Sequence, residues 1–332
     1  MTLPKVTVVI PVYDAEDYLA ETLRSALTQD YADLEVVAVN DGSRDGSAAI
    51  LEGWKDDRLI VVHQGNAGQS AAANAGIRRS SGELIKFLDQ DDVLNSCHVS
   101  AQVAAMGGQG DVVASCRWAY FRGDIKSAVF SPRATDRDYA DPIGWIKDTL
   151  TRDCGMMGGW QWLVPRSLLD KAGMWDERLS LENDFDFTIR ILLAATGIRF
   201  APEASLYYRK GLLTSLSAGR SRRAMESALL ATEQQCRNLL ARDPSTEMRR
   251  ICADRFQKWL YQMYPAFPDL AHRAEGHIGE LGGSTFEPRG GTIYCCLRRL
   301  LTWKQVRWLQ HLAYRIGWLW VLKARGRRGS VP

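Results

Sequence analysis

The hydrophobic and polar positions of the first 90 residues alternate between short apolar runs and amphipathic stretches. Apolar, largely β-branched runs typical of strands buried on both faces occupy residues 6–12, 34–40, 59–63 and 84–88. Stretches with apolar residues three or four positions apart predict helices over residues 18–27, 47–54 and 70–79. This alternation predicts a Rossmann-like α/β fold in which helices flank a mostly parallel sheet.

The remaining residues have a mixed pattern followed by a helical one. Short strands are expected over residues 112–116, 162–164, 198–200 and 205–208, and helices over 166–172 and 184–196. Beyond Gly219 the pattern is largely helical, with an interruption over 265–291 where proline and glycine occur. We therefore expect an α/β domain over residues 1–218 and a helical, basic region over 219–332.

The composition is that of a folded globular protein, since 46% of the 332 residues are hydrophobic and 24% are charged. Residues 1–218 hold 22 Lys and Arg against 30 Asp and Glu, a net charge of −8, whereas residues 219–332 hold 20 against 9, a net charge of +11. The acidic part argues against a nucleic-acid partner, and the basic part predicts an anionic partner. Seven cysteines without a CxxC pair favour a reducing, cytoplasmic compartment. No apolar run reaches the roughly 18 residues of a membrane-spanning helix.

Four acidic side chains follow predicted strands. Asp41 comes after the second strand, and Asp89, Asp91 and Asp92 come after the fourth. Ligands of such sheets bind beyond the carboxyl ends of the strands. Neighbouring carboxylates repel each other unless a cation compensates them, and an Asp-x-Asp turn suits Mg²⁺ or Mn²⁺. The alternatives are that these acids form a polar turn or cap the following helix, which for Asp41 is the helix from Ser47.

Several motifs resemble those of the family 2 glycosyltransferases with the GT-A fold. They are Val9-Ile10-Pro11-Val12-Tyr13, Asn40-Asp41-Gly42-Ser43-Arg44-Asp45-Gly46-Ser47, Asn66-Ala67-Gly68, Ala73-Asn74-Ala75-Gly76 and Asp89-Gln90-Asp91-Asp92. The motifs occur in the order and at the spacing of the family, over residues 4–210. The resemblance implies inverting transfer of a sugar from a nucleotide diphosphate donor, with UDP-sugars favoured.

The same resemblance implies which residues meet the donor. Nucleotide-binding roles are implied for Pro11, Val12, Tyr13, Asp41, Gly68, Asn74, Asp89 and Arg209. Asp89 and Asp91 match the DxD motif of the family and are expected to hold Mn²⁺ or Mg²⁺, with Asp91 as the direct ligand. Such a metal stabilises the departing diphosphate as a Lewis acid. Arg209 suits a phosphate because its guanidinium is a planar fork of donors; the alternative is an exposed basic residue without a ligand.

Inverting transfer also needs a base within hydrogen-bond reach of the acceptor hydroxyl. By resemblance this base is Asp184. The family often has Glu directly before this Asp, where this chain has Asn183, so Glu182 is a rival; both acids could instead only favour a helix N-terminus. The resemblance also implies that Trp160, Trp162 and Asn183 line the acceptor cleft, and the alternative for the two tryptophans is packing in the core.

The end of the chain is basic and aromatic. Residues 289–328 contain ten Lys and Arg, no Asp or Glu, and four tryptophans among leucines. A helix of this kind is expected to lie on an anionic membrane surface, and the alternative is a helix that packs on the domain or on a second copy. Gln305-Val306-Arg307-Trp308 resembles the QxxRW motif of processive synthases but is one residue short, which favours a non-processive enzyme.

Together these features predict a metal-dependent glycosyltransferase that adds one sugar to a glycan or lipid-linked acceptor of the cell envelope, in polysaccharide biosynthesis, as a peripheral protein at the cytoplasmic face of the membrane. The alternatives are a nucleotidyltransferase and a catalytically silent nucleotide-sugar-binding protein. A nucleotidyltransferase would have a Gly-rich basic loop after the first strand, which residues 11–16 do not provide. The silent protein could dispense with Asp184.

Overall fold

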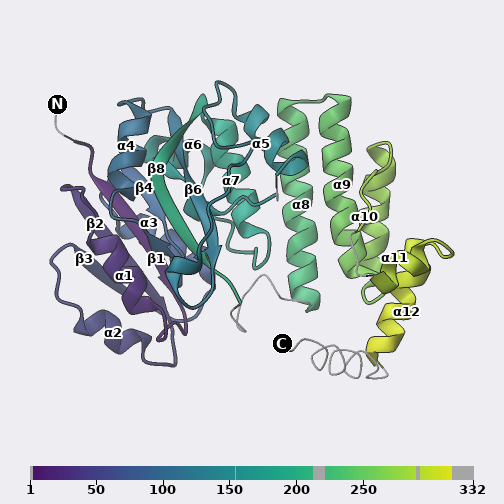
Figure 1. Ribbon diagram of the computed structural model, residues 1–332, viewed down its shortest axis with the longest axis horizontal. Coiled ribbons are helices and arrows are strands. Elements are labelled where there is room, and N and C mark those ends of the chain that lie inside the picture. Colours follow the sequence, from purple (N-terminus) through teal and green to yellow (C-terminus); the bar gives the residue numbers. More distant parts are fainter. Residues whose placement is uncertain (1–2, 154, 212–220, 289–291, 316–332) are drawn as a thin grey trace.

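The computed structural model describes residues 3–153, 155–211, 221–288 and 292–315, which include an eight-stranded sheet in the order β3-β2-β1-β4-β7-β6-β8-β5 (Figure 1). The strands are β1 Val6–Val12, β2 Leu34–Asp41, β3 Leu59–Gln64, β4 Leu84–Phe87, β5 Val93–Leu94, β6 Val112–Phe121, β7 Leu163–Pro165 and β8 Gly197–Arg209. As predicted, β3, β2, β1 and β4 run parallel to one another. Their carboxyl ends therefore meet at one edge of the sheet, next to Tyr13, Asp41 and Asp89.

The other half of the sheet is mixed. β7 runs antiparallel to β4 and β6, β6 and β8 are parallel, and β5 is antiparallel to β8. The two short strands expected over 198–200 and 205–208 form one strand, β8, because its pairing with β6 continues across a register shift between Cys116 and Arg117. At the end of β8 the N–H of Arg209 donates to the Asp92 carboxylate at 2.9 Å, so this strand reaches the acidic loop after β4.

Helices cover both faces of the sheet. They are α1 Leu19–Leu27, α2 Ser47–Gly53, α3 Gln69–Arg79, α4 His98–Met106, α5 Pro142–Thr151, α6 Arg166–Ala172 and α7 Asn183–Ala194, with 3-10 turns η1 Ile125–Ser127 and η2 Gly159–Gln161. Alternate residues of β1 enter different cores: Val8 and Ile10 pack with α1, α2 and α4, whereas Val9 packs with α3, α5, α6 and α7. This burial on both faces is the arrangement that the uninterrupted apolar run predicts.

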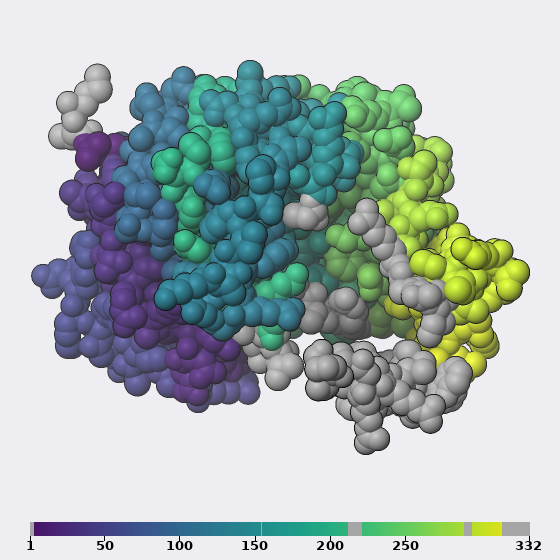
Figure 2. Space-filling view, viewed as in Figure 1, coloured from purple at the N-terminus to yellow at the C-terminus, as the bar shows by residue number. Residues whose placement is uncertain are grey.

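The C-terminal helices pack against the sheet part. α8 Arg222–Arg242, α9 Thr246–Met263 and α10 Pro268–Glu280 stand side by side next to α7, and α11 Thr292–Arg298 and α12 Trp303–Arg315 follow at the far end (Figure 1). Met225 and Phe256 of these helices belong to the same apolar cluster as Val9 of the sheet. Figure 2 accordingly shows the two parts in contact along this face of the molecule. The expected boundary between residues 218 and 219 lies outside the described residues.

One expectation about the helices is wrong, and α4 and α5 are not predicted by the sequence analysis. The sequence predicts an interruption over 265–291, yet α10 lies within it, because Pro268 occupies the first turn, where its missing N–H costs no hydrogen bond. The mixed pattern before residue 183 does not predict α5, although Asp141 followed by Pro142 is a helix-start signal, and the Asp141 side chain accepts the N–H of Ile143. Among the helices that the structure describes, none combines the length and the apolar character needed to cross a membrane.

Candidate active site

Four carboxylates gather where β4 ends. Asp89, Asp91 and Asp92 follow this strand in one short loop, and Asp184 comes from the first turn of α7. Asp184 is close enough for its charge to raise the pKa of Asp89. The structure thus brings the predicted metal ligands and the predicted base together.

These carboxylates repel one another. Burial raises the pKa of Asp89 well above its ordinary range, and the charges of Asp184 and Asp91 raise it further. Burial also raises the pKa of Asp92 in this way, with Asp91 and Asp89 adding to the shift. Burial raises the pKa of Asp91 as well, and the Arg209 charge offsets part of that shift. An acidic cluster that is only partly compensated is typical of a site that meets a cation or moves a proton.

Asp184 accepts a backbone hydrogen bond, and its surroundings shift its pKa. Its Oδ1 accepts the backbone N–H of Gly159 at 2.9 Å. Burial raises the pKa of Asp184 to about 6, the Gly159 N–H opposes this shift, and the Glu182 charge adds to it. A carboxylate with this pKa is ionised at neutral pH and is a competent proton acceptor.

The glycine pair before Trp160 permits the contact with Asp184. A Cβ on Gly159 would lie 2.7 Å from Cη2 of Trp175 and 3.3 Å from Oδ1 of Asp184, and a Cβ on Gly158 would lie 2.1 Å from Nε1 of Trp160. Only a residue without a side chain leaves room for both rings. The sequence analysis does not assign a role to Gly159; the Gly-Gly pair is the signal that could have indicated one.

Lys86 and Tyr208 complete the surroundings of the acids, and neither is indicated by the sequence analysis. Lys86 is fully buried in β4 and donates from Nζ to the carbonyl oxygen of Trp160 at 2.5 Å, and burial lowers its pKa to about 8. Burial raises the pKa of Tyr208, and the charges of the four acids add to this shift. A lysine inside an apolar strand is a signal for such a site, because a buried ammonium needs a specific partner.

The loop after β1 is tied to the acidic loop. Gln90 accepts the N–H of Tyr13 at 2.6 Å through Oε1 and donates from Nε2 to the Tyr13 carbonyl at 3.0 Å. Pro11 and Tyr13 are half-buried, so both keep surface for a ligand. Val12 is 1% exposed and packs in the core, so its side chain does not line a base pocket, contrary to the expectation.

Asp41 shapes the loop between β3 and α3. Its Oδ1 accepts the Ala67 N–H at 2.8 Å and Nε2 of Gln64 at 2.7 Å, and its Oδ2 accepts the Gly68 N–H at 2.8 Å. Gly68 is exposed and has a φ of 95°, which glycine adopts without strain. Asp41 therefore orients this loop, and contacts of Asp41 and Gly68 with a nucleotide stay predictions.

Asn74 and Arg209, both expected to bind the nucleotide, make hydrogen bonds within the protein instead. The amide of Asn74 is buried; it donates to the Trp175 carbonyl and accepts the Trp175 N–H, each at 2.9 Å. Arg209 is 7% exposed, and its guanidinium donates to the Asp91 carbonyl oxygen at 2.9 Å and to Glu21 at 2.5 Å. We correct both assignments: Asn74 anchors the segment before α7, and Arg209 supports the acidic loop.

The two tryptophans expected to stack on an acceptor lie in the core. Trp162 is 1% exposed and meets Trp145 with ring centroids 4.8 Å apart. Trp160 is 3% exposed and meets Trp118 with ring centroids 5.3 Å apart. The alternative of core packing therefore holds for both tryptophans, and the expected acceptor contact does not, because a buried indole has no free face for a sugar.

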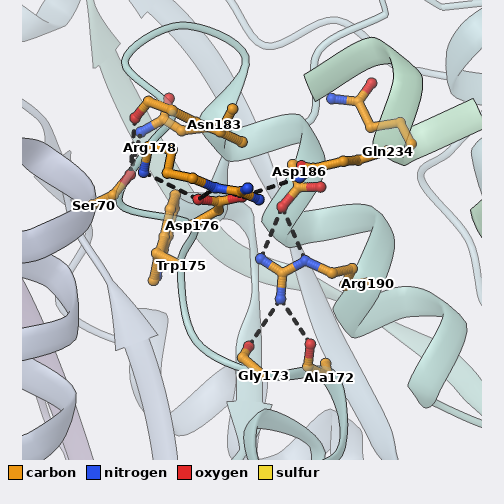
Figure 3. Close-up of polar contacts among 12 residues, drawn as sticks. Ser70, Ala172, Gly173, Trp175, Asp176, Arg178, Asn183, Asp186, Arg190 and Gln234 are labelled. Atoms are coloured by element: carbon orange, nitrogen blue, oxygen red, sulfur yellow. Dashed lines mark hydrogen bonds and ion pairs between the residues drawn. The ribbon is translucent and has the colours of Figure 1, made fainter. Parts of the chain in front are cut away.

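Asn183 links α7 to the acidic loop through α3. Its Nδ2 donates to Oε1 of Gln69 at 3.2 Å and to Oγ of Ser70 at 3.3 Å. Figure 3 shows the contact with Ser70. Gln69 in turn donates from Nε2 to Oδ1 of Asp89 at 3.1 Å. A contact of Asn183 with an acceptor stays a prediction, and its observed contacts join α7 to α3, whose Gln69 reaches the acidic loop.

Glu182, the rival base, is already neutralised. Its Oε2 accepts from Nη2 of Arg255 at 2.6 Å, and both side chains are buried. This buried ion pair occupies the Glu182 carboxylate. Asp184 is therefore the better candidate for the base.

The acidic loop fits a metal that takes few protein ligands. Within the described residues, no group of three or more His, Cys, Asp or Glu side chains is arranged to hold a metal ion. Mg²⁺ in phosphate sites commonly takes one or two carboxylates and completes its shell with phosphate oxygens and water. The half-buried carboxylates of Asp89 and Asp91, together with the unpartnered buried Oδ2 of Asp92, supply hard oxygen donors of this kind.

The fold and site define an α/β protein with an acidic cluster at the carboxyl ends of parallel strands, where ligands of such sheets bind. The chain belongs to glycosyl transferase family 2, whose sequence profile matches residues 7–172. It is similar to the uncharacterized glycosyltransferase EpsJ of Bacillus subtilis, with 28% identity over 63% of this chain, and to the putative glycosyltransferase EpsH of the same organism, with 28% identity over 75%. The chain covers 62% of EpsJ and 73% of EpsH, and 59% of a third relative, the uncharacterized glycosyltransferase RT0329 of Rickettsia typhi, which is 29% identical over 57% of this chain.

Among solved structures, the chain resembles residues 1–349 of TarS from S. aureus, crystallised in complex with UDP-GlcNAc. The TM-score is 0.60 and the sequence identity 18%, over 83% of this chain and 89% of that one. At this identity the likeness concerns the fold, and it confirms the GT-A type of α/β architecture with helices after the sheet.

Proposed function

We propose that this chain catalyses inverting, metal-dependent, non-processive transfer of a sugar from a nucleotide diphosphate to a hydroxyl of a glycan or lipid-linked acceptor. The observation that carries the proposal is the position of Asp184, a carboxylate whose pKa burial raises to about 6, beside the acidic loop of Asp89 and Asp91. Membership of glycosyl transferase family 2 supports it.

The reaction needs one proton transfer. The acceptor oxygen attacks the anomeric carbon while Asp184 takes the hydroxyl proton, and the bond from the anomeric carbon to the diphosphate oxygen breaks on the opposite face. The nucleotide diphosphate leaves with the bonding electron pair, so the configuration inverts. Asp89 and Asp91 would hold the divalent ion, which when bound supplies Lewis-acid stabilisation of the leaving group.

UDP-sugars are the favoured donors. TarS, whose fold this chain shares over 83% of its length, has been crystallised with UDP-GlcNAc and with UDP. Pro11 and Tyr13 are half-buried and Gly68 is exposed, so all three keep surface for a base, and Tyr13 is tied to the acidic loop through Gln90.

A donor screen followed by product analysis tests this function. Thermal shifts with nucleotide diphosphates and their sugars, with Mn²⁺ or Mg²⁺, identify the donor; NMR of the product then shows the anomeric configuration. A product of inverted configuration, together with loss of turnover in Asp184→Asn, supports the proposal. Binding of a UDP-sugar without any turnover would favour the silent binding protein, and transfer of a nucleotidyl group would favour a nucleotidyltransferase.

We also propose that the end of the chain meets an anionic membrane surface, as expected for a peripheral protein of the cytoplasmic face. Trp308, Leu309 and Leu312 are exposed on one face of α12, and Leu300 is 87% exposed beside the exposed Arg299. Exposed aromatic and aliphatic side chains near basic ones suit an anionic interface. Val306 of α12 is fully buried, so this helix also packs on the protein. Residues 316–328 of the basic stretch lie outside the described residues.

A further inference from the structure

The residue before α7 has a strained backbone. Glu182 has φ 63° and ψ 14°, in the left-handed region that residues other than glycine adopt only uncommonly. Such a conformation persists where the surrounding structure over-determines it, and it is often found at functional sites. Glu182 lies two positions before the proposed base, Asp184.

Helices α8 and α9 hold this residue from outside the sheet part. Nη2 of Arg255 in α9 lies 2.6 Å from Oε2 of Glu182 and 2.5 Å from Oε1 of Gln235 in α8. The side chains of Arg255 and Glu182 are only 6% and 9% exposed. Ser227 of α8 accepts the N–H of Leu181 at 3.0 Å and donates to the Leu181 carbonyl at 2.9 Å.

Stability alone does not explain a buried ion pair. The cost of taking two charges out of water often exceeds their attraction, and in some proteins such pairs specify one conformation instead. Here the conformation is that of Glu182, whose carbonyl accepts the Asp186 N–H at 3.1 Å and so begins α7. Asp184 lies in the same turn, so the backbone at Glu182 sets the direction of its carboxylate.

The body of α7 is anchored independently of Glu182. Asp186 and Arg190 of α7 form an ion pair at 2.9 Å, and Arg190 also donates to the carbonyl oxygens of Ala172 and Gly173 (Figure 3). These contacts fix the body of α7 on α6. The start of its first turn is held by Asn183 on α3, by the Gly159 N–H on Asp184, and from the side of α8 and α9 by the contacts of Glu182.

We propose that Arg255 is a positioning residue for the base: it holds Glu182 in the left-handed conformation and thereby directs Asp184 toward Gly159 and the acidic loop. The C-terminal helices are then part of the catalytic apparatus. This inference rests on the proposed role of Asp184 as the base.

Hydrogen exchange and kinetics on the full chain test the proposal. The double variant Arg255→Met/Glu182→Gln removes both charges, so no unpaired charge stays buried. Arg255→Lys keeps the charge and loses the guanidinium fork. The matched control is Arg273→Met, which breaks an ion pair with Glu233 in the same helical region; the Arg273 side chain is 57% exposed.

We expect the amides of Gly159 and Asp186 to exchange at least tenfold faster in the double variant, and kcat to fall about 10- to 100-fold with KM and the affinity for UDP within twofold. Arg255→Lys should be intermediate and the control unchanged. Exchange and kcat like those of the parent in the double variant would overturn the proposal. If the double variant does not fold, Arg255→Lys decides by the same two readouts. If the parent protein transfers no sugar from any donor, the proposed function fails, while the exchange rates still decide whether Arg255 holds this turn.

Discussion

The N–H of Gly159 donates to Oδ1 of Asp184 at 2.9 Å, and this contact joins the η2 turn to α7, which carries the proposed base. A Cβ at residue 159 would lie 2.7 Å from Cη2 of Trp175. We therefore expect Gly159→Ala to displace the turn and to lower kcat about 10- to 100-fold. The control is Gly276→Ala in α10, where nothing lies within 4 Å of the added atom, and stability should change little or rise. An unchanged kcat in Gly159→Ala would show that this contact does not orient the base.

Asp184→Asn should remove the proton acceptor. We expect kcat to fall about 10²- to 10⁴-fold, while the affinity for UDP, measured by calorimetry, stays within twofold. In the parent protein, kcat/KM should fall as the pH drops through about 6, because Asp184 then becomes protonated. Full turnover in the variant would mean that another group acts as the base.

The same substitution should stabilise the protein at neutral pH. Because the pKa of Asp184 is raised from 3.8 to about 6 in the folded state, the folded chain binds more protons than the unfolded chain between these values, and stability falls as the pH rises through them. We expect Asp184→Asn to be more stable than the parent by about 1–3 kcal/mol above pH 6, with the difference vanishing below pH 4 in urea titrations. A less stable variant at pH 7 would contradict the raised pKa.

Glu35 should behave in the opposite way. Burial disfavours its charge, but hydrogen bonds from Lys5, Thr7 and Ser81 outweigh this and lower the pKa of Glu35 from 4.5 to about 2. Its stabilising contribution is present above pH 4.5 and is lost as the pH falls toward 2. Glu35→Gln should therefore cost about 1–3 kcal/mol at pH 7, and the deficit should shrink on acidification in urea titrations. A deficit independent of pH would assign the effect to packing instead of charge.

Asp91→Ala tests the metal assignment. Mn²⁺ should raise the affinity of the parent protein for UDP in calorimetry, since the ion neutralises both the acidic loop and the diphosphate. The variant should lose most of this gain, whereas Asp57→Ala, at an exposed position of the same domain, should keep it. If Mn²⁺ raised the affinity for UDP equally in all three proteins, the metal would have to bind other ligands.

Truncation before Arg289 should reduce sedimentation with vesicles that contain phosphatidylglycerol. The double variant Trp308→Ser/Leu312→Ser should do the same in the full chain, because it removes exposed apolar area from α12. Val129→Ser changes a residue that is 77% exposed and should have no effect. Full retention after truncation would make the region structural.

Much of the fold follows from local sequence patterns. The apolar runs of β1 and β2 and the placement of acids after β2 and β4 are local features, and each strand and each acid lies where these features indicate. α10, α4 and α5 are exceptions: Pro268 reads as an interruption although it begins a helix, and the patterns over α4 and α5 do not predict the helices found there.

The roles of single side chains are less accessible from the sequence. Asn74 and Trp160 carry the chemistry of ligand-binding residues, and whether they face a ligand depends on which distant segments surround them. For Asn74 the deciding partner, Trp175, lies 101 residues away. Arg209 likewise suits a phosphate by its chemistry, but β8 brings it to Glu21 of α1 and to the carbonyl oxygen of Asp91.

The sequence by itself determined the α/β class, the family resemblance and the acids that end the parallel strands, because these depend on residue type and on spacing along the chain. Only the tertiary structure decided that a buried arginine of α9 pairs with Glu182, the rival of the proposed base Asp184. Burial and neighbouring charge set the chemistry of a carboxylate, and both arise from contacts between residues far apart in the chain.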